Sequence, residues 1–181
     1  MKAIILDRDG IINKCMPPHQ YVTKLSEIEY LEENIVLFSK IRKDIPIFIV
    51  TNQQGVGKGL MSTEELDIIN YKILEYLEKF NIQIIKIYVC THLENDNCKC
   101  RKPKPEMLLR IAQDYGVDLT DSLLIGDSET DIICANNAKC KSVYFGIKKI
   151  KYSPTYIAEN QIKLLEILEL NGFISDYDTT I

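Results

Sequence analysis

Two carboxylates directly follow an apolar run near the start of the chain, in the segment "AIILDRDGII". Side chains of an extended chain alternate between its two faces, so Asp7 and Asp9 are expected on one side and Arg8 on the other. Gly10 allows the backbone to turn away sharply after them. Two like charges this close repel each other unless a cation lies between them, and their oxygens suit Mg²⁺. A solvated turn is the alternative for such a pair taken alone.

Three further segments carry groups suited to a phosphate. "VTNQQGVGKG" presents the hydroxyl of Thr51 beside closely spaced glycines, and "CRKPKP" offers the planar fork of Arg101 and the point charge of Lys102. "LIGDSETD" adds Asp127 and Asp131, and Asp127 is a further candidate ligand for Mg²⁺. Taken singly, these segments could be a flexible turn, a solvated charged face and an acidic helix cap.

The positions of these residues follow from the elements predicted around them. Apolar, β-branched runs predict buried strands, and segments of helical period lie between them. Alternating strands and helices predict an α/β fold of three layers, in which helices cover both faces of a parallel sheet. In such a sheet ligands bind beyond the carboxyl ends of the strands, where the residues above lie. The predicted strands are 3–7, 45–52, 84–91, 122–127 and 141–146, and the predicted helices are 32–44, 62–80, 105–115, 128–138 and 155–171.

Length and composition indicate one globular domain over residues 1–181. The chain is 46% hydrophobic and 27% charged, and it has no apolar run long enough to span a membrane. Its net charge of −4 disfavours a nucleic-acid partner. The early charges after "MKAIIL" are not typical of a secretory signal, so we expect a cytoplasmic protein. Nothing in the sequence indicates a subunit interface, so we expect a monomer. We also expect the tail at about 173–181 to be frayed.

Four potential metal ligands lie close together in "CTHLENDNCKCRKP". Cys90, His92, Cys98 and Cys100 could complete a tetrahedral Zn²⁺ site with no open position, so we predict a structural zinc that clamps a loop. Unmetallated surface thiols are the alternative. His19, the only histidine outside this cluster, is expected on the surface.

The order DxDG, hydrophobic-Thr-Asn, Lys and GDxxxD resembles the haloacid dehalogenase (HAD) superfamily of phosphotransferases. This resemblance implies a HAD-like phosphatase in which Asp7 is the nucleophile and Asp9 the general acid and base. It also implies that Thr51 and Lys102 hold the phosphoryl oxygens, while Mg²⁺ lies on Asp7, the carbonyl of Asp9 and Asp127. Gly10 and Asp131 are expected to support the site.

The motifs DRDGxIN, TNQxGxxxG and CxH…CxCRKP narrow the resemblance to a subgroup. In these motifs the chain is similar to the subgroup that contains D-glycero-D-manno-heptose 1,7-bisphosphate 7-phosphatases and histidinol-phosphate phosphatases. The motif spacing leaves no room for a large cap domain, so loops must cover the site and the substrate should be small. We favour the heptose bisphosphate, a sugar phosphate of nucleotide-activated heptose biosynthesis, and keep histidinol phosphate as the alternative. The expected substrate-binding residues are Asn52, Gln53, Arg101, Tyr21 and Lys58.

Three other functions are disfavoured by the same residues. A receiver domain pairs adjacent acids at its first strand, whereas the acids here are spaced DxD. A zinc-stabilised binding protein with a silent site would be expected to lack one of the motif residues, and Asp7, Asp9, Lys102 and Asp127 are all present. A polynucleotide phosphatase would favour an aromatic and basic strip that this acidic chain does not show.

Overall fold

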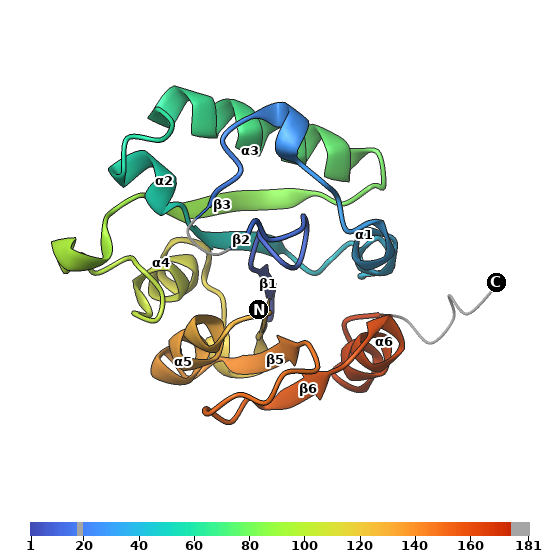
Figure 1. Ribbon diagram of the computed structural model, residues 1–181. Coiled ribbons are helices and arrows are strands. Elements are labelled where there is room, and N and C mark those ends of the chain that lie inside the picture. The colour runs from blue at the N-terminus through green and yellow to red at the C-terminus, as the bar shows by residue number, and fades with distance from the viewer. Residues whose placement is uncertain (18–19, 175–181) are drawn as a thin grey trace.

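The computed structural model describes residues 1–17 and 20–174, and its centre is a sheet in which every strand pairing is parallel (Figure 1). The strands lie in the order β3-β2-β1-β4-β5-β6. This order places β1 and β4 side by side at the centre, where the connections lead outward in opposite directions. Such a point opens a crevice at the carboxyl ends of the strands. The strands are β1 (Ile4–Leu6), β2 (Ile47–Asn52), β3 (Ile84–Cys90), β4 (Leu123–Gly126), β5 (Lys141–Phe145) and β6 (Tyr156–Ala158).

Helices cover both faces of this sheet and complete the three predicted layers (Figure 1). One face packs against α1, α3 and α6, and the other packs against α4 and α5. Alternation along β1 explains the two cores, because Ile4 and Leu6 belong to the first and Ile5 to the second. The helices are α1 (Glu32–Phe38), α2 (Gln54–Gly57), α3 (Thr63–Glu78), α4 (Glu106–Tyr115), α5 (Glu129–Ala138) and α6 (Gln161–Leu170), with 3-10 turns at Leu25–Glu27, Glu94–Asp96 and Leu119–Asp121.

Local signals set the ends of several helices. α3 begins with a capping box, in which the Ser62 side chain accepts from the Glu65 N–H and the Glu65 carboxylate accepts from the Ser62 N–H. α4 ends at Gly116, whose φ of +66° suits the left-handed conformation after a helix. α6 begins after Asn160, whose side chain accepts from the Lys163 N–H.

The structure corrects two of the predicted elements and adds a third that the sequence did not predict. The segment predicted as one helix over 155–171 contains β6, which extends the sheet beside β5, and only then α6. The helix predicted over 32–44 ends at Phe38, although Ile41 and Ile45 in the following turns still reach the core and prolong the apolar pattern. The short α2 was not predicted.

The end of the chain is only partly described. Phe173 and Ile174, the first residues of the segment expected to fray, are buried, and Ile174 pairs with Ile41 in an isolated bridge. This corrects the expected start of the frayed tail. Residues 175–181 and His19 lie outside the described residues.

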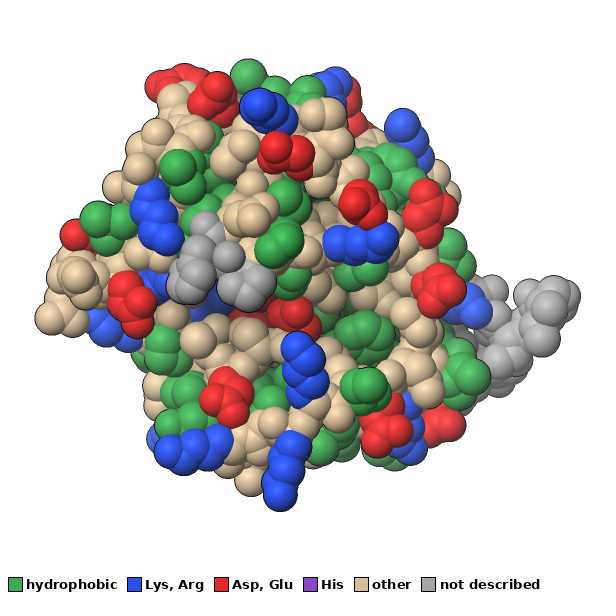
Figure 2. Space-filling model, in the orientation of Figure 1, with side chains coloured by type: hydrophobic (Ala, Val, Ile, Leu, Met, Phe, Trp, Pro, Cys, Tyr) green, Lys and Arg blue, Asp and Glu red, His purple; other side chains and the backbone are tan. Residues whose placement is uncertain are grey.

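The described parts of the chain form one sheet and the helices that cover it. The interval between β1 and β2 holds α1, and the interval between β2 and β3 holds α2 and α3. Within the ranges 1–17 and 20–174, no helix combines the length and the apolar character needed to cross a membrane. The face drawn in Figure 2 mixes acidic and basic side chains.

Candidate active site

Six motif side chains meet at the carboxyl edge of the central strands, and we call this set the catalytic floor. Five of them end or closely follow a strand or lie in the first turn of the next helix, and Lys102 lies in the loop between β3 and α4. The parallel sheet thus brings together residues that are far apart in the sequence. Every member except Asp9 and Asp127 is buried. The catalytic floor consists of Asp7, Asp9, Thr51, Lys102, Asp127 and Asp131.

Lys102 joins two of the carboxylates. Its Nζ lies 2.8 Å from Oδ1 of Asp7 and 2.7 Å from Oδ1 of Asp131, and it donates to the carbonyl of Val50 at 3.1 Å. Burial alone would lower the pKa of Lys102, but the charges of Asp131 and Asp7 more than offset burial, so the net shift is upward. Lys102 therefore stays a cation in the interior, where a phosphoryl oxygen could meet it.

Asp7, Asp127 and Asp131 form a group of carboxylates whose oxygens lie within 4.8 Å of one another. Burial raises the pKa of Asp7, with a further rise from Asp131 and an opposing effect of Lys102. Burial and the charge of Asp131 also raise the pKa of Asp127. Carboxylates packed this closely need positive charge beyond that of Lys102, and the donor set fits a hard cation such as Mg²⁺.

Two glycines make this close packing possible. A Cβ built on Gly10 would lie 2.1 Å from Oδ2 of Asp127, and one on Gly126 would lie 2.4 Å from Cγ of Asp131. Gly10 also has a φ of +85°, which L side chains rarely adopt. Asp131 accepts from the N–H of Ser128 in a capping box at the start of α5, so this residue both caps the helix and pairs with Lys102.

Asp9 is held from several sides. Its Oδ1 accepts from Asn13 at 2.8 Å, and its Oδ2 accepts from Gln53 at 2.7 Å. Arg8 also contacts Asp9, with Nη2 to Oδ1 at 3.1 Å, which corrects the expectation that Arg8 points away from the acids. The period-two argument fails here because β1 ends at Leu6 and the chain turns over the next four residues.

Two of the expected substrate-binding amides face the protein itself. Asn52 donates to the carbonyl of Lys102 and accepts from the Lys102 N–H, both at 3.0 Å. Gln53 is fully buried, and its Nε2 donates both to Asp9 and to the hydroxyl of Thr51, at 2.8 Å. Both amides therefore hold catalytic-floor residues by hydrogen bonds.

The four predicted zinc ligands come together at the end of β3 and in the loop after it. Their ligand atoms lie within 4.8 Å of one another, with Sγ of Cys90 and Cys98 3.6 Å apart, Sγ of Cys98 and Cys100 3.6 Å apart, and Sγ of Cys100 3.3 Å from Nδ1 of His92. Tetrahedral zinc with bonds of about 2.3 Å to sulfur requires sulfur atoms about 3.8 Å apart, so the donor set fits this metal. Burial raises the pKa of the Cys90 thiol to about 12, so metal binding would have to displace its proton.

A second group of polar side chains lies around Gln54 at the start of α2, and we call this group the rim (Tyr21, Gln54, Lys58 and Arg101). Oε1 of Gln54 accepts from the Tyr21 hydroxyl at 3.3 Å and from Nη2 of Arg101 at 3.4 Å. Lys58 donates to the same hydroxyl at 3.3 Å. Nη1 of Arg101 is buried and has no hydrogen-bond partner among the described residues. Three of the predicted substrate-binding residues therefore meet at Gln54.

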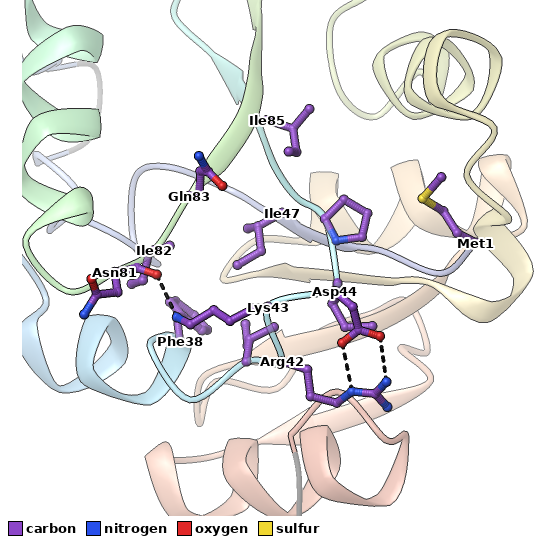
Figure 3. A pocket seen from close by; sticks show the side chains of 13 residues that line it. Met1, Phe38, Arg42, Lys43, Asp44, Ile47, Asn81, Ile82, Gln83 and Ile85 are labelled. Atoms are coloured by element: carbon purple, nitrogen blue, oxygen red, sulfur yellow. Dashed lines mark hydrogen bonds and ion pairs between the residues drawn. The ribbon is translucent and has the colours of Figure 1, made fainter.

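The cavities distinguish this edge of the sheet from the opposite one. A cavity of about 200 Å³ beside the metal loop is lined by residues that include Cys98, Arg101, Lys102 and Thr130. A cavity of about 280 Å³, drawn in Figure 3, lies where β2 and β3 begin, and its Lys43 donates to the carbonyl of Asn81. Arg42 pairs with Asp44 there at 2.6 Å. The candidate site is therefore at the carboxyl edge.

Sequence reasoning missed four contacts of the site. Gln54 and Asn13 had visible positions inside the quoted motifs, but only the folded loops show what they bind. Asn70 of α3 accepts from Arg8, and a buried asparagine on an apolar helix face was the available signal. The exposed thiol of Cys15 donates to Asp127 at 3.4 Å.

Comparisons with known proteins agree with this geometry. Residues 99–161 match the family model described as HAD-hydrolase-like. A D-glycero-beta-D-manno-heptose-1,7-bisphosphate 7-phosphatase of Helicobacter pylori is 35% identical over 146 residues, which cover 78% of this chain and 81% of that protein. The histidine biosynthesis bifunctional protein HisB of Campylobacter jejuni subsp. doylei is 31% identical, but the match covers only 42% of that protein and 80% of this chain. The crystal structure of D,D-heptose 1,7-bisphosphate phosphatase from B. bronchiseptica, complexed with magnesium and phosphate, superposes with a TM-score of 0.83 at 29% identity, over 95% of this chain and 100% of that one.

Proposed function

Because the chain belongs to the heptose 1,7-bisphosphate 7-phosphatase family of HAD-like hydrolases, we propose that it removes the 7-phosphate of D-glycero-D-manno-heptose 1,7-bisphosphate. The observation that carries this proposal is the position of Lys102, which lies between the candidate nucleophile Asp7 and its supporting partner Asp131. A buried cation beside a carboxylate at the crevice of the sheet suits attack on a phosphoryl group.

The reaction proceeds in two displacements. An oxygen of Asp7 forms a bond to phosphorus while the bond from phosphorus to the sugar oxygen breaks, and the departing oxygen takes a proton from Asp9. Water then attacks the phosphorus of the aspartyl-phosphate and gives a proton to Asp9. The bond from phosphorus to Asp7 breaks, which releases inorganic phosphate and restores both carboxyl groups.

Other residues of the catalytic floor hold the phosphoryl group. Thr51 presents a buried hydroxyl and Lys102 a buried ammonium group beside Asp7. Both can donate to the phosphoryl oxygens, which gain charge density as the bonds rearrange. Asp131 holds Lys102 in place, and Gln53 holds Thr51 and Asp9 together.

The close carboxylates support a Mg²⁺ site formed by Asp7 and Asp127, together with the carbonyl of Asp9. When bound, this ion neutralises negative charge during phosphoryl transfer. The cysteine cluster supports a structural Zn²⁺ on Cys90, His92, Cys98 and Cys100, separate from the reaction.

The rim and the adjacent cavity support a small bisphosphate as the substrate. Arg101 directly precedes Lys102, and its guanidinium group can bind the phosphate at position 1 while Lys102 binds the phosphate that leaves. Tyr21 and Lys58 offer further donors beside it. All of these residues belong to one chain, which supports an enzyme that acts as a monomer.

Histidinol phosphate is the second candidate substrate, because the HisB relatives match most of this chain. It carries one phosphate and a cationic amine, whereas the rim carries Arg101 and Lys58 without a facing carboxylate among the described contacts. This charge pattern favours the bisphosphate.

The test is phosphate release with Mg²⁺ from a panel of small phosphates. The panel holds both anomers of the heptose bisphosphate, fructose 1,6-bisphosphate and histidinol phosphate. The proposal predicts the highest kcat/KM for one heptose anomer, abolished by Asp7→Asn and retained by Asp121→Asn, a control at an exposed aspartate.

Two outcomes would contradict the proposal. Preference for histidinol phosphate would assign the same chemistry to histidine biosynthesis. No phosphate release from any member by a folded protein that holds both metals would favour the binding-protein alternative.

A further inference from the structure

Arg8 is the largest fully buried side chain of the described structure, although it lies between the two catalytic acids. A guanidinium group keeps its charge at all ordinary pH values, so its burial requires partners. Its carboxylate partner is Asp9, which receives Nε at 3.2 Å and Nη2 at 3.1 and 3.2 Å. The two planar groups therefore face each other through both carboxylate oxygens.

The other end of the guanidinium group is held by α3. Nη1 of Arg8 donates to Oδ1 of Asn70 at 3.1 Å. Asn70 is buried on the apolar face of α3, next to Ile69 and one turn from Leu66 and Ile73. A polar side chain at such a position is costly unless it is hydrogen-bonded, and Arg8 supplies the bond.

We infer that Arg8 and Asn70 are positioning residues for Asp9, which connect the general acid and base to helix α3. This inference rests on the proposed role of Asp9. Asn13 and Gln53 also donate to this carboxylate, but among the described residues only Arg8 donates to both of its oxygens, and Asn70 holds the far end of Arg8. We call these contacts of Arg8 with Asp9 and Asn70 the clamp. The clamp limits how far the carboxylate of Asp9 can move.

The position of Asp9 matters most when the leaving group needs a proton. A general acid must lie within hydrogen-bond reach of the departing oxygen, and a displacement of about 1 Å can cost about a hundredfold in rate. A sugar oxygen leaves poorly without protonation, whereas 4-nitrophenolate leaves without it. A loosened clamp should therefore slow the sugar phosphate much more than p-nitrophenyl phosphate.

The test compares kcat/KM for these two substrates in Asn70→Leu and in the wild type. For each substrate, kcat/KM reports the steps up to departure of the leaving group. It does not report hydrolysis of the aspartyl-phosphate, a step that both substrates share. We expect about a tenfold loss with the heptose bisphosphate and less than about a twofold loss with p-nitrophenyl phosphate. Asn70→Asp keeps an oxygen facing Arg8 and should retain the wild-type ratio of the two values.

Ile73→Ala is the matched control for looser packing of α3, because Ile73 is buried on the same face and touches no polar group of the site in the contacts described. Ile73→Ala should change kcat/KM by the same factor for both substrates. If Asn70→Leu does not fold, Arg8→Lys replaces it, because an ammonium group cannot hold Asp9 and Asn70 in one plane.

Parallel losses on both substrates, or no loss, would overturn the inference. Asp9→Asn separates that result from a failure of the proposed function. If Asp9→Asn lowers kcat/KM equally for both substrates, the proposed role of Asp9 as general acid is wrong. If Asp9→Asn lowers kcat/KM selectively for the sugar phosphate but Asn70→Leu does not, the role of Asp9 stands and only the positioning role of Arg8 and Asn70 is rejected.

Discussion

The catalytic floor and the rim lie side by side but are held in different ways. Lys102 contacts Asp7 and Asp131 at 2.8 and 2.7 Å in the buried interior, whereas the neighbouring Arg101 meets Gln54 at 3.4 Å with one nitrogen unpartnered in the described structure. The catalytic floor is thus preorganised, and the rim keeps free donors for a ligand. The difference indicates that the residues at the sheet edge determine the reaction, whereas the residues of the surrounding loops determine which substrate binds.

The largest effect is expected from removing the central cation of the catalytic floor. Lys102→Met leaves Asp7 and Asp131 buried without their partner, so unfolding should become easier by about 3 kcal/mol. Loss of a preorganised donor should also lower kcat/KM by about a thousandfold. Urea unfolding and phosphate release measure the two quantities. Unchanged kcat/KM in a folded variant would show that the catalytic floor does not need this cation.

A single methyl group tests how tightly the catalytic floor is packed. Gly10→Ala would place its Cβ against Asp127, so we expect kcat/KM to fall by about a hundredfold. Gly116→Ala is the control, because Gly116 has a similar positive φ but no atom within 4 Å of such a Cβ. The control should lose about 1 kcal/mol of stability and retain activity. Equal activity of the two variants would mean that Asp127 can move freely.

Loss of the proposed zinc site should affect the rim more than the catalytic floor. Cys98→Ser is expected to release zinc, measured by metal analysis. Lys102 remains anchored by Asn52, Asp7 and Asp131, whereas Arg101 has Gln54 as its described side-chain partner. KM should therefore rise about tenfold, with kcat within about threefold. Cys140→Ser, at a buried thiol outside the cluster, should change neither. A fall in kcat without a rise in KM would contradict this prediction, because it would show that the metal loop supports the catalytic floor and not the rim.

Sequence patterns predict the catalytic floor better than the rim for a physical reason. Parallel strands end at one edge, so residues after apolar runs, such as Asp7 and Asp127, must meet there. Gln54 could not be chosen in this way, because its partners come from separate loops whose paths no periodicity describes. Arg8 was misplaced because alternation stops where β1 stops.

The same reasoning explains the errors in the fold. Apolar runs revealed the central strands, but β6 lies just before the cap of α6, where its residues join the apolar pattern of that helix. Its identity as a strand depends on pairing with β5, which is a tertiary contact. α1 was extended because Ile41 and Ile45 continue the apolar pattern from turns.

The most direct measurement compares Arg101→Ala with Lys102→Met on heptose 1,7-bisphosphate and on heptose 7-phosphate, which lacks the second phosphate. These residues are adjacent in sequence but belong to the rim and to the catalytic floor. We expect Arg101→Ala to reduce the preference for the bisphosphate by about tenfold, since it removes a charged hydrogen bond, and Lys102→Met to lower kcat/KM for both substrates equally. Equal losses on both substrates with Arg101→Ala would contradict the division between chemistry and substrate choice.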